Sequence, residues 1–127
     1  MGLEQIVRFP EGTVPSWHAV HELLVKHGVP VQMRMINGEL AFPDEVPAEP
    51  WTELRVATAA GMVTLRRGPD RVTLVTWGNA EATLMRLRNA LAWAFAEAGA
   101  GRVGTGQGEQ DAIGFRKTAD MPAEFGG

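Results

Sequence analysis

The three histidines of the chain, His18, His21 and His27, lie within ten residues of one another. On a helix, residues three and four apart are neighbours, so His18, His21 and Glu22 would share one face. Two imidazoles and a carboxylate are ligands that Zn²⁺ accepts, which makes a metal-dependent enzyme one hypothesis. The spacing lacks the His-Glu-x-x-His pattern of zinc proteases, and a solvated polar helix face is the interpretation we favour. His27 would lie on the opposite side of this helix, near its C-terminus, where a positive charge is favoured.

Other catalytic chemistry has little support in the residue types present. The chain has no cysteine and no tyrosine, which excludes thiol nucleophiles, disulfides and a phenolic acid or base. Its single serine, Ser16, stands where a helix needs an N-cap. Residues 99–104 spell G-x-G-x-x-G, but a dinucleotide site needs a strand before that pattern and a helix after it. A helix precedes it here, so we predict no catalytic residue and no cofactor.

Charge is distributed unevenly along the chain. The formal net charge is −3, from 12 basic and 15 acidic side chains, which disfavours nucleic-acid binding. Arg66, Arg67 and Arg71 are expected to converge at the tip of a hairpin. A mixed-sign solvated surface is the interpretation we favour, and contact with an anion or an acidic partner is the alternative. An acidic run could bind a hard cation, although a solubilising loop fits its proline-broken spacing better. Its members are Glu39, Asp44, Glu45, Glu49 and Glu53.

The elements that must position these residues follow from periodicity, caps and turns. A helix is expected from about Pro15 to His27, capped by Thr13 or Ser16 and ended by Gly28. A second helix is expected from the N-cap Asn79 to about Ala98. Strands are expected at residues 3–9, 31–36, 39–42, 53–58, 62–67 and 71–77, with a proline-rich extended connection at 43–50.

The clearest local signal is a hairpin around Asn37-Gly38. Asn-Gly favours a type I′ turn, in which both central residues have positive φ. A two-residue loop pairs Met35 with Leu40 and Met33 with Phe42, and all four side chains then fall on one face. They are predicted to be ordinary core or, alternatively, to line an apolar cavity that binds a small ligand between the sheet and the second helix.

This element string, β-α-β-β-β-β-β-α, predicts an α+β fold. We expect a curved antiparallel sheet of about five to six strands with the long C-terminal helix across one face. The order of elements over residues 3–98 resembles helix-grip and TATA-binding-protein-like architectures; no motif accompanies the resemblance and it assigns no residue. We expect residues 1–99 to form one domain and 100–127 a glycine-rich flexible connection and tail, from which Ile113 and Phe115 dock onto the domain.

The back of the second helix carries an additional apolar strip, opposite the face that should contact the sheet. Its members and their polar neighbours are Met85, Arg86, Asn89, Ala92, Trp93 and Ala96. Tryptophan and arginine are over-represented among interface anchors. Either the tail folds back over Trp93, or a second copy packs its own helix there to form a two-fold homodimer.

These observations favour a small soluble domain that acts without catalysis. We expect a protein-interaction or self-assembly module; the alternatives are the apolar-ligand binder and the metal-dependent enzyme described above. No run of about 18 apolar residues is present, and so we expect no membrane span. The absence of cysteine fits a reducing compartment, and we expect a cytoplasmic protein.

Overall fold

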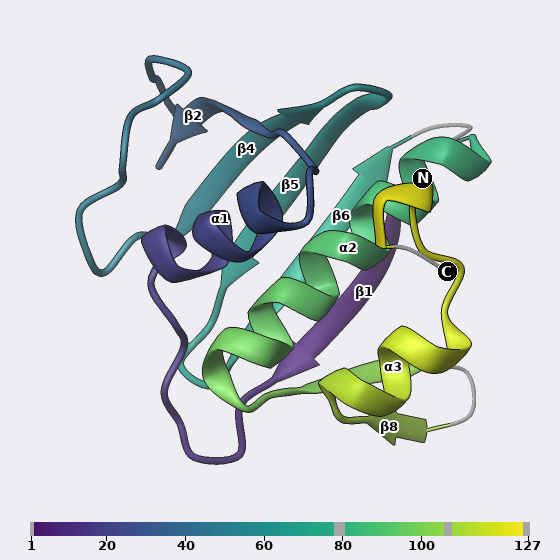
Figure 1. Ribbon diagram of the computed structural model, residues 1–127. Helices are drawn as coiled ribbons and strands as arrows, with labels where there is room; N and C mark the ends of the chain where they lie inside the picture. Colours follow the sequence, from purple (N-terminus) through teal and green to yellow (C-terminus); the bar gives the residue numbers. More distant parts are fainter. Residues whose placement is uncertain (1, 78–80, 106–107, 126–127) are drawn as a thin grey trace.

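The helices of this chain all lie on one face of a single sheet (Figure 1). The structure is a computed structural model that describes residues 2–77, 81–105 and 108–125. The strands are β1 Gly2–Arg8, β2 Gln32–Ile36, β3 Glu39–Leu40, β4 Glu53–Thr58, β5 Gly61–Arg67, β6 Arg71–Trp77, β7 Arg102–Thr105 and β8 Gly108–Gln110. The helices are α1 Trp17–Lys26, α2 Ala82–Gly99, α3 Ala112–Thr118 and the short 3₁₀ helix η1 Ala123–Phe125. The fold is therefore α+β, as the sequence predicts.

The strands follow the order β3-β2-β4-β5-β6-β1-β7-β8, and every neighbouring pair is antiparallel. The N-terminal strand β1 thus lies inside the sheet, between β6 and β7. The two edge strands, β3 and β8, have only two and three residues. Such short edges offer few free backbone groups to a strand of another chain.

One core lies between the sheet and the helices. Side chains alternate along a strand, so one face of β1, β5 and β6 presents Val7, Leu65 and Leu74, all fully buried, to the helices. From the helix side, α2 contributes Leu91 and Phe95, which are also fully buried. In Figure 1, α2 crosses β1 and β6, α1 lies beside it over β4 and β5, and α3 covers the β7–β8 end. None of the described helices is long and apolar enough to cross a bilayer.

Two of the predicted local signals are confirmed, the cap of α1 and the Asn37-Gly38 turn. Ser16 caps α1, since its hydroxyl accepts a hydrogen bond from the backbone N–H of Ala19 at 3.2 Å. Asn37 and Gly38 have φ values of 51° and 85°, as a type I′ turn requires. The predicted cap Asn79 lies outside the described residues, and Glu81 precedes the first residue of α2.

The prediction of five to six strands is too low, because β7 and β8 form within the segment expected to be a flexible connection. A Cβ atom added at Gly99 or Gly101 would lie 2.7 Å or 2.8 Å from the ring of Phe9. The absence of side chains at these two glycines lets Phe9, which is 1% exposed, pack where α2 passes into β7. These glycines therefore let the ring of Phe9 approach the backbone closely. Glycine content alone does not distinguish this role from chain flexibility, which is why the sequence predicted a flexible connection here.

This explanation predicts a difference between two neighbouring glycines. Gly101→Ala should lower the free energy of unfolding by about 1–3 kcal/mol, because the new methyl group overpacks Phe9 and the carbonyl oxygen of Arg8. Gly104→Ala, three residues further along in β7, is the matched control, since the nearest atom to its added Cβ, the carbonyl oxygen of Ile6, lies 3.5 Å away. Its effect should stay within about 0.5 kcal/mol. Urea denaturation measures both, and equal losses in the two variants would contradict the explanation.

Candidate functional site

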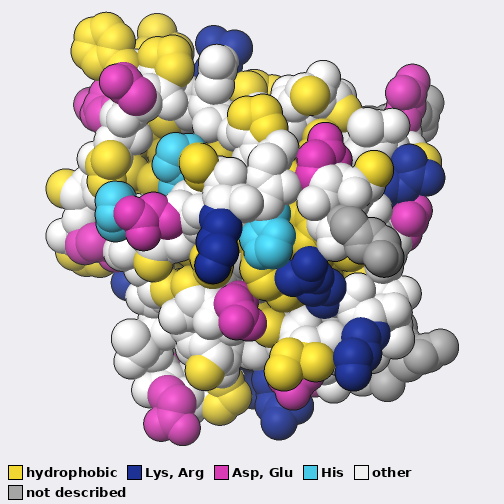
Figure 2. Space-filling model, in the orientation of Figure 1, with side chains coloured by type: hydrophobic (Ala, Val, Ile, Leu, Met, Phe, Trp, Pro, Cys, Tyr) yellow, Lys and Arg dark blue, Asp and Glu magenta, His cyan; other side chains and the backbone are white. Residues whose placement is uncertain are grey.

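The sheet face turned away from the helices is uncovered by any described element. In the β5–β6 pair, Leu65 and Leu74 point to the helices, so their neighbours Arg66 and Thr73 point to the opposite side. We call this side the open face. Figure 2 shows the other side of the molecule, where acidic, basic, histidine and apolar side chains are interspersed.

A connected set of polar and aromatic side chains crosses the open face over β4, β5 and β6. The guanidinium carbon of Arg66 lies 5.7 Å from the ring centroid of Trp77, and its Nε lies 3.3 Å from Oε2 of Glu53. The indole Nε1 of Trp77 donates to Oγ1 of Thr64 at 3.4 Å. Trp77 is 52% exposed, whereas Thr64 beneath it is buried. These contacts hold a tryptophan and an arginine in fixed positions at the surface.

Arginine is the commonest charged residue on the strands of the open face. By register, this side carries Arg8, Arg55, Arg66, Arg71 and Arg102 against Glu4, Glu53 and Glu109 in the described residues. Arg8 pairs with Glu109 through both Nε and Nη2. The hydrogen bond and the charge of its partner raise the pKa of Arg8, and the same hydrogen bond holds the pKa of Glu109 below its ordinary value.

Arg55, near the middle of this surface, has no ion pair with any described residue. It is exposed and lies across the strands from Met35 and Thr64. Two apolar side chains of the same face are also exposed, Met62 at 41% and Leu40 at 89%. Exposed tryptophan, methionine and arginine together are typical of protein-interface cores.

The predicted arginine cluster at the hairpin tip does not converge. Successive strand residues point to opposite faces, so Arg66 lies on the open face and Arg67 on the helix side. Arg67 Nη1 lies 2.7 Å from Oε1 of Glu49, with its guanidinium over the ring of Trp51. Arg71 Nε lies 3.2 Å from Oδ1 of Asp70. Each arginine has a carboxylate of its own, and of the three only Arg66 and Arg71 share a face.

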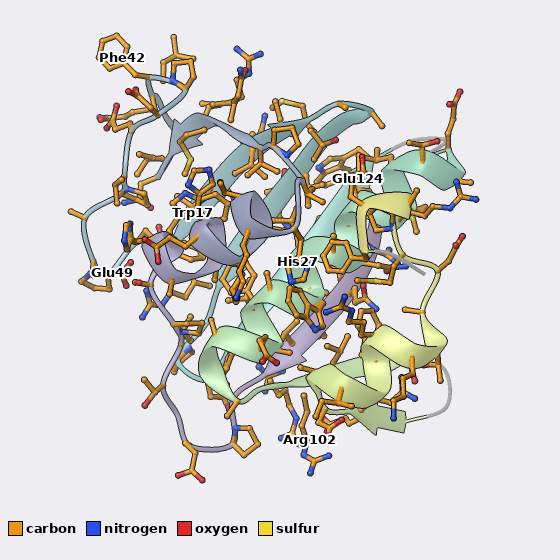
Figure 3. The ribbon with its side chains drawn as sticks, in the orientation of Figure 1. Trp17, His27, Phe42, Glu49, Arg102 and Glu124 are labelled. Carbon is orange, nitrogen blue, oxygen red and sulfur yellow. The ribbon has the colours of Figure 1, made fainter. Side chains whose placement is uncertain are left out.

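The four residues predicted to line an apolar cavity are also separated. The β2–β4 register shifts between Met33 and Met35. Because of this β-bulge, the two side chains lie on opposite faces of the sheet instead of the same face. Met33 is buried against the helices, whereas Met35 and its partner Leu40 lie on the open face. The predicted Met33–Phe42 pair is not formed, because β3 ends at Leu40. Phe42 is 75% exposed and points away from the molecule (Figure 3).

The structure does not bring the proposed metal ligands together. Nε2 of His18 lies 3.0 Å from Oε1 of Glu22, while His21 stacks on Trp17 with ring centroids 5.8 Å apart. Among the described residues, no group of three histidine, aspartate or glutamate side chains is arranged to hold a metal ion. The acidic run is likewise divided, since Glu49 and Glu53 pair with arginines on opposite faces of the sheet.

The apolar strip on the back of α2 is covered by the C-terminal segment. Trp93 is 4% exposed, and the ring of Phe125 meets it edge-on with centroids 5.1 Å apart. Arg116 lies over both rings, at 5.2 Å and 5.1 Å, and its Nη2 donates to the carbonyl oxygen of Phe125 at 3.1 Å. Of the two predicted docking residues, Phe115 is buried but Ile113 is 65% exposed.

Polar contacts hold the same segment to α2. Nε of Arg86 lies 3.0 Å from Oδ2 of Asp120, and Nδ2 of Asn89 donates to the backbone carbonyl of Asp120 at 2.9 Å. Of the remaining apolar members, Ala92 and Ala96 are buried. Met85 is half-buried, and its Sδ lies 3.7 Å from Oγ1 of Thr76 in β6 rather than against the C-terminal segment.

The tail therefore folds back over Trp93, but through Phe125 and Arg116 rather than the predicted Ile113 and Phe115. The surface proposed for a homodimer is occupied within the chain.

His27 belongs to this cluster, a role that the sequence did not reveal. Its ring stacks on Phe125 at 4.8 Å and meets Trp93 edge-on at 5.0 Å (Figure 3). Burial lowers the pKa of His27, and the charges of Arg116 and Lys26 add to the effect. The structure thus disfavours the protonated form of His27, which its position at the C-terminus of α1 alone would favour.

Comparison of the chain with protein families, curated proteins and solved structures found no match. The helix-grip or TATA-binding-protein-like architecture accordingly stays an expectation from element order.

The lowered pKa of His27 predicts a pH-dependent contribution to stability. The unfolded chain binds the proton more readily, so the contribution is complete above the ordinary histidine pKa of about 6.5 and is lost as the pH falls below it. Urea midpoints should therefore fall more between pH 8 and pH 5 for the native chain than for His27→Gln. His18→Gln is the control for replacing a histidine by glutamine, because that imidazole lies outside the cluster. Equal pH profiles for the native chain and His27→Gln would contradict the assignment.

Proposed function

We propose that this chain is a non-enzymatic protein-interaction module that binds a partner protein on the open face of its sheet. The observation that carries the proposal is the Trp77–Arg66–Glu53 array, which stands exposed on a sheet face that no described element covers. Tryptophan and arginine are the residues most enriched among the few that dominate binding energy at interfaces. Their contacts with one another reduce the conformational entropy lost on binding.

The arginines of this face favour a partner that brings carboxylates. Arg55 is exposed without an ion pair among the described residues, and a guanidinium fork matches a carboxylate with two parallel hydrogen bonds. Met62 and Leu40 supply apolar surface around it. Because β3 and β8 are short, docking on the face is favoured over addition of a strand at an edge.

A model peptide tests this function without knowledge of the natural partner. A peptide of alternating glutamate and leucine is titrated into the ¹⁵N-labelled full chain, with an alternating glutamine–leucine peptide as its neutral counterpart. The acidic peptide should shift the Trp77 indole and the amides of β4, β5 and β6, and it should bind more tightly than the neutral one. Trp77→Ala and Arg55→Glu should each weaken binding about tenfold, as expected for interface anchors.

Two substitutions on other surfaces are the controls. Phe42→Ala removes another exposed aromatic ring and Lys26→Glu reverses a charge on the helix side; both should bind as the native chain does. Shifts confined to the helix side, or equal affinity in all variants, would overturn the proposal. So would tighter binding of oligothymidylate than of the acidic peptide. A native chain that is dimeric at micromolar concentration and monomeric as Trp77→Ala would instead assign the face to self-assembly.

A further inference from the structure

A second feature, away from the Trp77–Arg66–Glu53 array, lies where α2 meets β1 and β7. Among the described residues, three buried side-chain atoms have no hydrogen-bond partner, and two of them belong to Arg88 and Gln5. The unpaired atoms are Nε of Arg88, a donor, and Oε1 of Gln5, an acceptor. Buried polar atoms are rarely left unpaired in proteins, because each loses its hydrogen bonds to water without replacement, so two at one place need an explanation.

Both side chains line the same pocket, of about 460 Å³. Its other lining residues are Glu4, Ile6, Gly104 and Thr105. The pocket forms because the β1–β7 ladder consists of only two pairs, Val7–Val103 and Arg8–Arg102. Beyond them the two strands are no longer paired, and Gly104 contributes no side chain to fill the space. A volume of this size matches a small metabolite.

Among the described residues, Arg88 lacks an ion pair although it is partly buried, whereas the unpaired Arg55 is exposed. Arg8, Arg66, Arg67, Arg71 and Arg86 each pair with a carboxylate. Arg88 has no ion pair with any described residue, and its one hydrogen bond is a long one, 3.4 Å from Nη2 to Oδ1 of Asn89. Burial lowers its pKa, which is the expected result of removing a cation from water without a counter-charge. A bound anion would supply that charge.

We propose that this pocket binds a small organic acid with a hydroxyl group beside its carboxylate. The carboxylate would accept two hydrogen bonds from the Nε–Nη2 edge of Arg88, the strongest geometry for this pair of groups. The hydroxyl would donate to Oε1 of Gln5, whose free lone pairs need a donor. Glu4, at the exposed rim, repels additional negative charge and so favours a monoanion over a phosphate.

The experiment uses the full chain with lactate, acetate and inorganic phosphate as probes at constant ionic strength. Lactate should raise the melting temperature and shift the ¹H–¹⁵N signal of Arg88 Nε. Acetate, which lacks the hydroxyl, should bind more weakly, and phosphate should bind more weakly than lactate. Arg88→Gln should abolish the lactate effect. Arg86→Gln is the matched control on the same helix, because Arg86 is exposed and already paired with Asp120; it should respond as the native chain does.

A second variant keeps the proposal testable if Arg88→Gln folds poorly. Gln5→Leu should weaken lactate binding about tenfold and leave acetate binding unchanged, because it removes only the acceptor of the hydroxyl. A lactate response that survives Arg88→Gln would overturn the proposal. So would the absence of any shift at Arg88 Nε in the native chain, or tighter binding of phosphate than of lactate. Because Trp77 and Arg55 do not line this pocket, the peptide-binding variants Trp77→Ala and Arg55→Glu should bind lactate normally.

Discussion

The packing of α2 against the centre of the sheet is the interaction on which the rest of the structure depends. Its buried face contacts β1, β6 and β7, which joins the N-terminal strand to the last strands of the chain. Phe95 of α2 also meets Trp17 of α1 and Trp51 of the loop before β4, each with centroids 6.4 Å apart. Since one helix connects α1, the sheet and the C-terminal segment, a loss of its packing would disturb all of them.

The same packing explains why the candidate site lies behind the sheet. All apolar side chains that the helices cover point one way, and the alternation of strand residues sends Arg55, Arg66 and Trp77 the other way. When helices cover only one side of a sheet, the other side faces solvent and carries polar side chains or large side chains that shield their neighbours. Here Trp77 lies over Thr64. The arginine-rich open face is therefore a direct consequence of one-sided burial.

The C-terminal segment completes the helix layer through aromatic and charged contacts with α1 and α2. Trp93, Phe125 and His27 form one cluster, and Arg116 lies over two of its rings. A tryptophan opposite the core side of a long helix suggested an interface, and the interface is within the chain. From sequence, the fold-back of the tail and a homodimer were equally consistent with that tryptophan, because both bury the same surface.

The sequence by itself determined the elements whose geometry depends on nearby residues. Ser16 caps α1 and Asn37-Gly38 makes the predicted turn, because hydrogen bonds and φ preferences within a few residues decide them. Only the tertiary structure decided the bulge between Met33 and Met35, the close packing of Phe9 on Gly99 and Gly101, and the pocket beside Arg88. Each of these depends on contacts between segments far apart in the chain, where volume and strand register, rather than residue type, determine which side chains meet.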